Sequence, residues 1–168
     1  MMDYLTHVLI LLFLAIMPIS EVRGALPYGV LIAGIHPVLA FILSVGGNIA
    51  IIYPLLYLLG WVEKFLFKTS KKKFSSKIRV KIAFLYVSFT SKIRKKVNPY
   101  VDKYGVVGLV LYTLIPLPFT GAWTASVAAH LLGMERNTAF MAVALGVIFA
   151  GLIMLAMIFL GFSIKPFL

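Results

Sequence analysis

The apolar segments of the chain fall into two length classes. Two of them, 37–60 and 138–161, are 24 residues long, which exceeds the ~20 residues that a helix needs to cross a bilayer. The other four are 7 to 14 residues long, too short to cross. The pattern therefore predicts two full transmembrane helices and four short helical arms, the arms being 4–17, 28–34, 105–115 and 122–132.

The short arms come in two pairs, each joined by a break that contains prolines. The first break is "PISEVRGALP" (18–27) and the second is "PLPFTG" (116–121). Proline has no amide hydrogen and interrupts a helix, so each pair is expected to enter the membrane and turn back as a re-entrant hairpin. Tight polar turns, "GIHP" (34–37) and "GMERN" (133–137), then lead into the full spans.

The two halves of the chain share this order of elements. If each hairpin returns to its starting side and each span crosses once, the second half begins on the opposite side of the membrane from the first. This arrangement is an inverted repeat, a plan used by many secondary transporters. The predicted fold class is an all-α integral membrane protein with a single membrane domain. Its parts are a first half over 1–61 (hairpin 4–34, span 37–60), a basic segment over 62–104, and a second half over 105–168 (hairpin 105–132, span 138–161).

The composition supports a membrane protein and shows where the charge is. Apolar residues make up 62% of the chain and charged residues only 12%, a balance that is not typical of a water-soluble domain. Of the 16 lysines and arginines, 13 lie within 61–104, and this segment accounts for the net charge of +11. Within it, apolar residues recur at helical spacing over 78–96 among lysines and arginines. This spacing predicts a basic amphipathic helix in the membrane interface.

The position of the basic segment predicts orientation and partners. Because positively charged loops stay in the cytoplasm, segment 61–104 is expected to be cytoplasmic and both termini outside, in a multi-pass protein of the plasma membrane. Its lysines and arginines are expected to contact anionic lipid headgroups rather than nucleic acid. The sequence leaves homo-oligomerisation open.

Glu21 and Arg23 lie in the first break, between two prolines and surrounded by apolar residues. A charge at membrane depth is costly and usually faces a cavity or a partner. Glu21 is the candidate for gaining and losing a coupled proton, and Arg23 is the candidate for holding an anionic headgroup by bidentate hydrogen bonds. The structural alternatives are that Glu21 is an exposed helix cap and that Arg23 only pairs with Glu21 or with a backbone carbonyl.

The breaks contribute further candidates for binding a substrate or an ion. Prolines free backbone carbonyls and expose helix N-termini, which favour an anion. Small residues at four-residue spacing around the second break are also typical of close helix packing, and packing is the alternative to a binding role. The candidates in and beside the breaks are Pro27, Pro116, Pro118, Thr120, Gly121 and Trp123.

Two candidates lie outside the breaks. Asn48 is within the first span, where a buried amide either joins helices or lines a cavity. Arg136 is in a predicted cytoplasmic turn, where it is solvated or guards the entrance. The chain has no cysteine, and the sequence lacks the motifs of zinc proteases, serine hydrolases and P-loop ATPases. Enzymatic activity, catalytic residues, metal ligands and cofactors are therefore not expected, apart from H⁺ or Na⁺ as a coupling ion.

Two stretches resemble a known family. "SEVRGALPYGVLIAG" (20–34) and "YTLIPLPFTGAWTASVAAHLLGMERNTAF" (112–140) resemble the small multi-drug export protein family, which is similar to the DedA superfamily of VTT-domain membrane proteins. The resemblance implies two re-entrant helices that meet near the membrane midplane. It also implies H⁺- or Na⁺-coupled movement of polyprenyl-phosphate lipid carriers, such as undecaprenyl or dolichyl phosphate. Where DedA proteins carry an arginine pair, this chain has Thr113 and Phe119, so Arg23 and Arg136 are the candidate replacements.

The predicted function is that of a DedA-like secondary transporter or lipid flippase. Arg23 and the helix ends would hold an anionic lipid headgroup, while Glu21 would couple its movement to a proton or a sodium ion. One alternative is efflux of small hydrophobic cations, with Glu21 as the counter-ion. Another is a membrane scaffold that transports nothing and whose basic segment recruits anionic lipids or partners.

Overall fold

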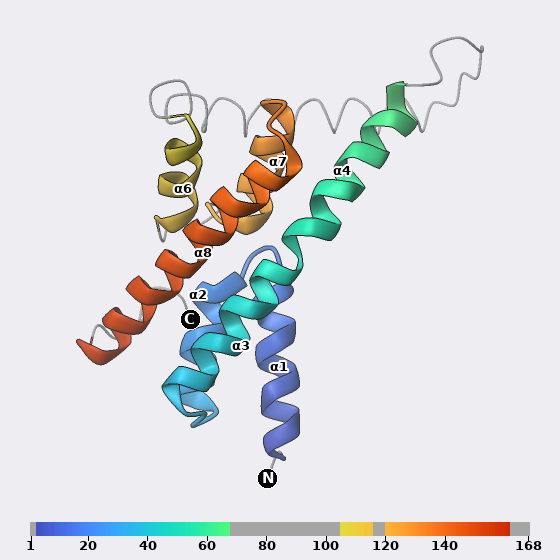
Figure 1. Ribbon diagram of the computed structural model, residues 1–168. Helices are drawn as coiled ribbons and strands as arrows, with labels where there is room; N and C mark the ends of the chain where they lie inside the picture. Colours follow the sequence, from blue (N-terminus) through green and yellow to red (C-terminus); the bar gives the residue numbers. More distant parts are fainter. Residues whose placement is uncertain (1–2, 68–104, 116–119, 162–168) are drawn as a thin grey trace.

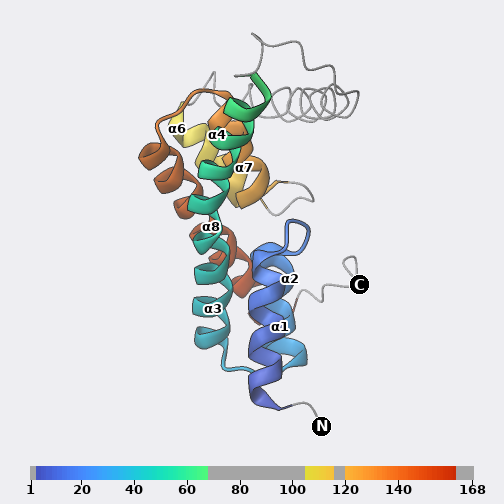
Figure 2. The same ribbon diagram turned by 90° about the vertical axis from the view of Figure 1, so that its right-hand side faces the viewer.

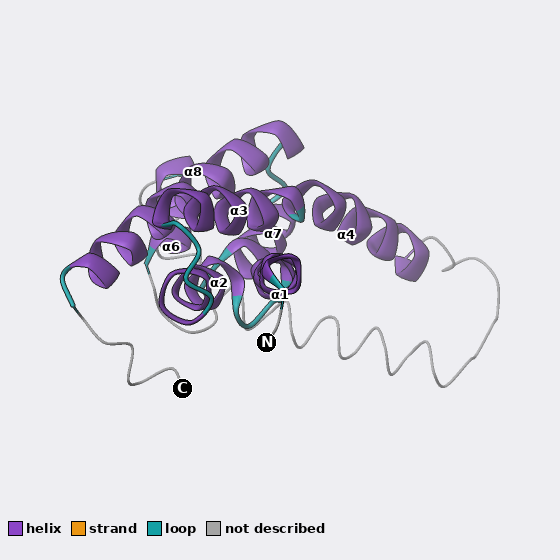
Figure 3. Ribbon diagram, turned by 90° about the horizontal axis from the view of Figure 1, so that it is seen from below, coloured by secondary structure: helices purple, strands orange, loops and turns teal. Residues whose placement is uncertain are grey.

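The computed structural model describes residues 3–67, 105–115 and 120–161, and these residues form helices and loops without a strand (Figure 3). This confirms the predicted all-α class. The predicted amphipathic helix over 78–96 lies outside the described residues. The helices are α1 (Tyr4–Ile16), α2 (Glu21–Pro27), the π-helical η1 (Tyr28–Ile32), α3 (Pro37–Ala50), α4 (Ile52–Phe67), α6 (Val106–Leu114), α7 (Ala122–Leu131) and α8 (Arg136–Phe159).

The short helices are arranged as two pairs that approach each other from opposite ends of the molecule. In Figure 1, α1 rises from the N-terminus to about mid-height and α2 runs back down beside it. From the other end, α6 descends to about mid-height and α7 returns (Figure 1). The two short hairpins follow the predicted order of elements. Their re-entrant placement in a membrane and the inverted repeat stay predictions.

The first break is shorter than predicted, because the helix restarts at Glu21 and not after Pro27. Pro27 is buried as the last residue of α2, and the chain continues directly into η1. There the N–H of Ala33 donates to the carbonyl of Tyr28 at 2.9 Å, a π-helical bond. A wider π-helical turn accommodates a local interruption within a continuing helix. The expectation that Pro27 breaks the helix and that 28–34 is a separate arm is therefore wrong.

Two helical segments are long and apolar enough to cross a membrane, Pro37–Val62 and Arg136–Phe159. Only 33% and 44% of their most apolar windows are buried within the protein, whereas a core helix of a soluble protein would be mostly buried. The first segment is interrupted where α3 meets α4 at Ile51. Pro54 explains the interruption, because it has no N–H to donate to the carbonyl of Ala50.

α8 packs against helices of both halves through small residues. A Cβ atom at Gly146 would overlap Thr113 of α6, and one at Gly151 would overlap Val45 of α3. Close approach of this kind gains packing contacts where lipid provides no hydrophobic drive between helices. Three small residues at four-residue spacing in α8 are buried: Ala142, Gly146 and Ala150.

Candidate functional site

The ends of four short helices lie at one level of the molecule, which we call the junction. α1 ends at Ile16 and α2 begins at Glu21, while α6 ends at Leu114 and α7 begins at Ala122. Figures 1 and 2 both show these ends near mid-height, where α3 meets α4. Five of the predicted site residues come together here: Glu21, Arg23, Thr120, Gly121 and Trp123.

Glu21 caps the start of α7. Its side chain is buried, with 5% exposed, and its Oε1 accepts a hydrogen bond from the N–H of Trp123 at 3.2 Å. The first amides of a helix lack intrahelical acceptors and carry the positive end of the helix dipole, so a carboxylate is stabilised there. The φ of Glu21 is 50°, which is uncommon for a residue with a side chain. Such strain persists where the surrounding contacts fix it, here the contact with α7.

Gly121 leaves the space that the Glu21 carboxylate occupies. A Cβ atom at residue 121 would overlap that carboxylate. The φ of Gly121 is 179°, an extended conformation open to any residue. Glycine is therefore required at this position for space. Its N–H donates to Oγ1 of Thr124 at 3.1 Å, which fixes the backbone beside the carboxylate.

Arg23 caps the end of α6. Its guanidinium donates to the carbonyls of Ile115 at 3.0 Å and Thr113 at 3.4 Å, and to Oγ1 of Thr120 at 3.1 Å. The Thr120 hydroxyl in turn donates to the Ile115 carbonyl at 2.7 Å. The last carbonyls of a helix have no intrahelical donor and carry negative partial charge, so a cation stabilises them.

Trp123 caps the end of α1, in the reverse direction. Its indole Nε1 donates to the carbonyl of Ile16, the last residue of α1, at 2.9 Å. The first hairpin therefore caps two helix ends of the second, and the second caps one helix end of the first. In a membrane no water is present to satisfy the backbone of an interrupted helix. The two charges of the first break are thus explained in the first place by the helix ends that they satisfy.

Of the remaining predicted residues, those that the structure describes take no part in these contacts. Arg136 is the exposed first residue of α8 and stacks over the Tyr57 ring, 4.5 Å from its centroid. It precedes Gly146 by ten residues, about 15 Å along the helix axis. Asn48 is fully buried on α3, and Pro27 is buried in α2. Pro116, Pro118 and Phe119 lie outside the described residues.

Arg23 and Arg136, the two residues predicted to replace the arginine pair of DedA proteins, lie in different places. Arg23 reaches the carbonyl of Thr113, one of the two positions concerned. Arg136 lies over Tyr57 on α4 and belongs to the end of the molecule where α8 begins. Arg23 therefore contacts Thr113, whereas Arg136 contacts Tyr57.

Sequence reasoning missed several groups that build the junction. The carbonyls of Thr113 and Ile115 accept from Arg23, and a backbone carbonyl has no sequence signature. Thr124 could have been found, because it is three residues after Gly121, which precedes α7, and a side chain at this spacing can bind back to the backbone before the helix. A further contact was also missed: Tyr53 of α4 donates to Oδ1 of Asn137 on α8 at 2.6 Å.

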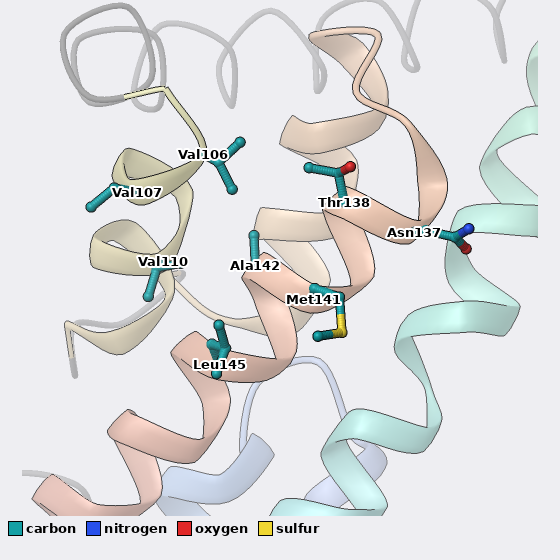
Figure 4. A pocket seen from close by; sticks show the side chains of 8 residues that line it. All are labelled: Val106, Val107, Val110, Asn137, Thr138, Met141, Ala142 and Leu145. Atoms are coloured by element: carbon teal, nitrogen blue, oxygen red, sulfur yellow. The ribbon is translucent and has the colours of Figure 1, made fainter.

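A groove with a volume of about 460 Å³ opens between α6 and α8 (Figure 4). Its lining is apolar apart from two side chains and contains neither Glu21 nor Arg23. The groove therefore suits a hydrocarbon surface, and the charged chemistry lies elsewhere. The lining residues are Val106, Val107, Val110, Asn137, Thr138, Met141, Ala142 and Leu145.

The comparison with known families gives one match. Residues 21–153 match the model of a family described as "Putative small multi-drug export protein". The matched range begins at Glu21 and includes both halves of the junction. No curated protein and no solved structure matches the chain. The wider placement in the DedA superfamily stays a prediction.

Proposed function

The chain belongs to the small multi-drug export protein family, and from this membership and the junction we propose that it is a membrane exporter of small hydrophobic cations, with Glu21 as their counter-ion. The family description supports export, and the two long apolar helices support a membrane protein. The buried carboxylate of Glu21 at the contact of the two hairpins is the observation that carries the proposal.

In the proposed topology, α3–α4 and α8 cross the membrane, and the hairpins α1–α2 and α6–α7 enter it from opposite sides. The lengths of the short helices support this arrangement, because none of them reaches the ~20 residues of a full crossing. The basic segment 62–104 would lie in the cytoplasm by the positive-inside rule. Substrates would then reach the junction from the bilayer, where hydrophobic cations concentrate.

The contacts of Glu21 support an exchange mechanism. In the structure its carboxylate accepts from the Trp123 amide and so holds the start of α7 to α2. A proton on the carboxylate removes its charge and weakens that hydrogen bond. A cationic substrate and a proton would compete for the same oxygens, so release of one accompanies binding of the other. The two hairpins could separate when the carboxylate is neutralised and close again when it is ionised.

One observation favours a second candidate function. The start of α7 already holds an oxyanion, namely the Glu21 carboxylate, and the guanidinium of Arg23 binds Thr120 close by. A phosphate headgroup has the same chemistry, so a polyprenyl-phosphate carrier could replace Glu21 there. Replacing Arg23 by alanine separates the candidates. Transport of a phosphate lipid should then be lost more severely than transport of a cation.

The experiment measures uptake of tetraphenylphosphonium into proteoliposomes under an imposed pH gradient. We expect Glu21→Gln to lower the rate about tenfold or more, because a charge-assisted hydrogen bond and the counter-ion are lost together. Glu21→Asp should keep part of the activity. Glu135→Gln is the matched control, because Glu135 is exposed in the turn before α8.

Three outcomes would count against the proposal. Full gradient-driven uptake by Glu21→Gln would exclude Glu21 as the coupling group. An absence of uptake by the unaltered protein, combined with movement of a polyprenyl phosphate, would favour the lipid carrier. If neither compound is transported and Glu21 and Arg23 can be substituted without effect on the protein, the result would instead support a scaffold.

A further inference from the structure

α3 carries two polar side chains that are buried without a hydrogen-bond partner. Ser44 and Asn48 are both 0% exposed. Oγ of Ser44 and both polar atoms of the Asn48 amide make no hydrogen bond. The two residues are four apart and therefore lie on one face of the helix. Buried polar groups nearly always have a partner, so an unsatisfied one calls for a physical explanation, of which a bound ion is one.

The register of α2 against α3 places Asn48 at the junction. Ala40 of α3 lies against Gly29, since a Cβ atom there would be 3.1 Å from the Ala40 Cβ. The two chain segments run antiparallel (Figure 1). Eight residues forward from Ala40 is Asn48, and eight residues back from Gly29 is Glu21. Asn48 is therefore at about the level of Glu21.

A second set of contacts gives the same level independently. Gly151 of α8 lies against Val45 of α3, and Gly146 of α8 lies against Thr113 of α6. α3 and α8 also run antiparallel (Figure 1). Asn48 is three residues after Val45, so it lies at the level of the part of α8 between Gly146 and Gly151. The carbonyl of Thr113 accepts a hydrogen bond from the Arg23 guanidinium and belongs to the junction. Asn48 therefore lies at the level of the junction, on the side formed by α3.

The interruption of the helix lies just beyond Asn48. Asn48 is in the last turn of α3, which ends at Ala50. The Ala50 carbonyl would be paired with residue 54 in a continuous helix, but Pro54 has no N–H. In membrane transporters, carbonyls at such interruptions and the C-terminal ends of half-helices coordinate Na⁺.

From these observations we propose that Ser44 and Asn48 bind a sodium ion on the buried face of α3, next to the interruption between α3 and α4. The oxygens on offer are neutral, which suits a hard monovalent cation. No group of three His, Cys, Asp or Glu residues that could hold a metal occurs among the described residues, so a transition-metal site is not indicated. The Asn48 Nδ2 would donate to a water in the shell of the ion. This site is independent of which compound is exported.

The test measures the thermal unfolding midpoint of the purified full chain in detergent as NaCl replaces choline chloride at constant ionic strength. Binding to the folded state raises Tm. We expect a saturable rise of about 3–10 °C between no Na⁺ and a concentration ten to a hundred times Kd. KCl should give a smaller rise at the same concentration.

Substitutions assign the response to the site. Asn48→Leu fills a similar volume without polar atoms and should abolish the Na⁺-dependent rise, and Ser44→Ala should reduce it. If Asn48→Leu does not fold, Ser44→Ala alone decides. Ser126→Ala is the matched control, because Ser126 is also fully buried without a hydrogen bond but lies on α7. The proposal is overturned if the unaltered protein shows no Na⁺-dependent rise, or if Asn48→Leu or Ser44→Ala keeps the full rise.

Discussion

Glu21 and Arg23 are opposite charges two residues apart that serve two different helices. Glu21 satisfies an amide at the start of α7, and Arg23 satisfies carbonyls at the end of α6. A pair directed only at each other would leave those helix ends uncapped in an apolar setting, which is costly. The same contacts make the pair sensitive to neutralisation, because loss of either charge weakens a link between the hairpins. In the proposed mechanism, the pair would therefore have a structural and a functional role at once.

Gly121→Ala adds one methyl group and so tests whether the Glu21 carboxylate needs the space beside residue 121. Gly121→Ala would displace the Glu21 carboxylate, since a Cβ atom there overlaps it. We expect a loss of about 1–3 kcal/mol of stability from the overlap and the weakened cap, measured by thermal unfolding of the purified protein in detergent. Gly46→Ala is the control, because nothing lies within 4 Å of a Cβ there. An unchanged Tm for Gly121→Ala would contradict the placement of Glu21.

The importance of this pair could be predicted from the sequence, and its partners could not. An acid and an arginine between apolar segments are recognisable because charge at membrane depth is costly. The partners of Arg23 are backbone carbonyls about ninety residues later in the chain. Their position depends on how the second hairpin docks, a property of the whole fold. The local sequence pattern therefore identified Glu21 and Arg23 but did not identify all the groups that they contact.

At the scale of elements, the two interruptions caused by proline differ. Pro27 is retained inside a helix that widens into η1, whereas Pro54 follows a boundary between α3 and α4. A proline pattern alone does not distinguish these outcomes, since each removes one N–H and the packing decides whether the helix continues. The lengths of the long helices were better predicted: the second span was expected at 138–161, and α8 covers Arg136–Phe159. Apolar length is a local property of the chain.

The boundary between α3 and α4 is expected to be needed for transport. Pro54→Ala restores the N–H that can pair with the Ala50 carbonyl, so α3 and α4 should join into one straighter helix. We expect a gain of up to about 3 kcal/mol in stability, the typical cost of an interior proline, together with slower uptake of tetraphenylphosphonium in proteoliposomes. Pro37→Ala is the control, because Pro37 is at the start of α3, where a proline costs little. Faster or unchanged uptake by a stabilised Pro54→Ala would show that the interruption serves no transport step.

At the scale of the whole molecule, the caps connect the two halves in both directions. Arg23 and Glu21 reach from the first half to the second, and Trp123 reaches from the second half to the first. α8 adds close contacts with both α3 and α6. Opening of one hairpin therefore affects the caps of the other. In an alternating-access transporter, such reciprocal contacts would couple the two sides, so that both do not open at once.

The proposed topology predicts which residues can be labelled from each side of the membrane. The chain has no cysteine, so a single introduced cysteine is the only one that can react. Single cysteines at Asp3 and His36 should react with a membrane-impermeant maleimide added outside cells, and those at Lys64 and Glu135 only after permeabilisation. All four residues are exposed.

A cysteine at Ile19, between α1 and α2, should react from neither side, because a re-entrant turn would lie in hydrocarbon. Ile19 is 88% exposed on the protein, so the protein itself would not prevent the reaction. Labelling of Ile19 from the cytoplasm would show that the first hairpin crosses the membrane. Labelling of Asp3 and Glu135 from the same side would contradict the opposite entry of the two hairpins, because the start of α1 and the start of α8 lie at opposite ends of the molecule (Figure 1).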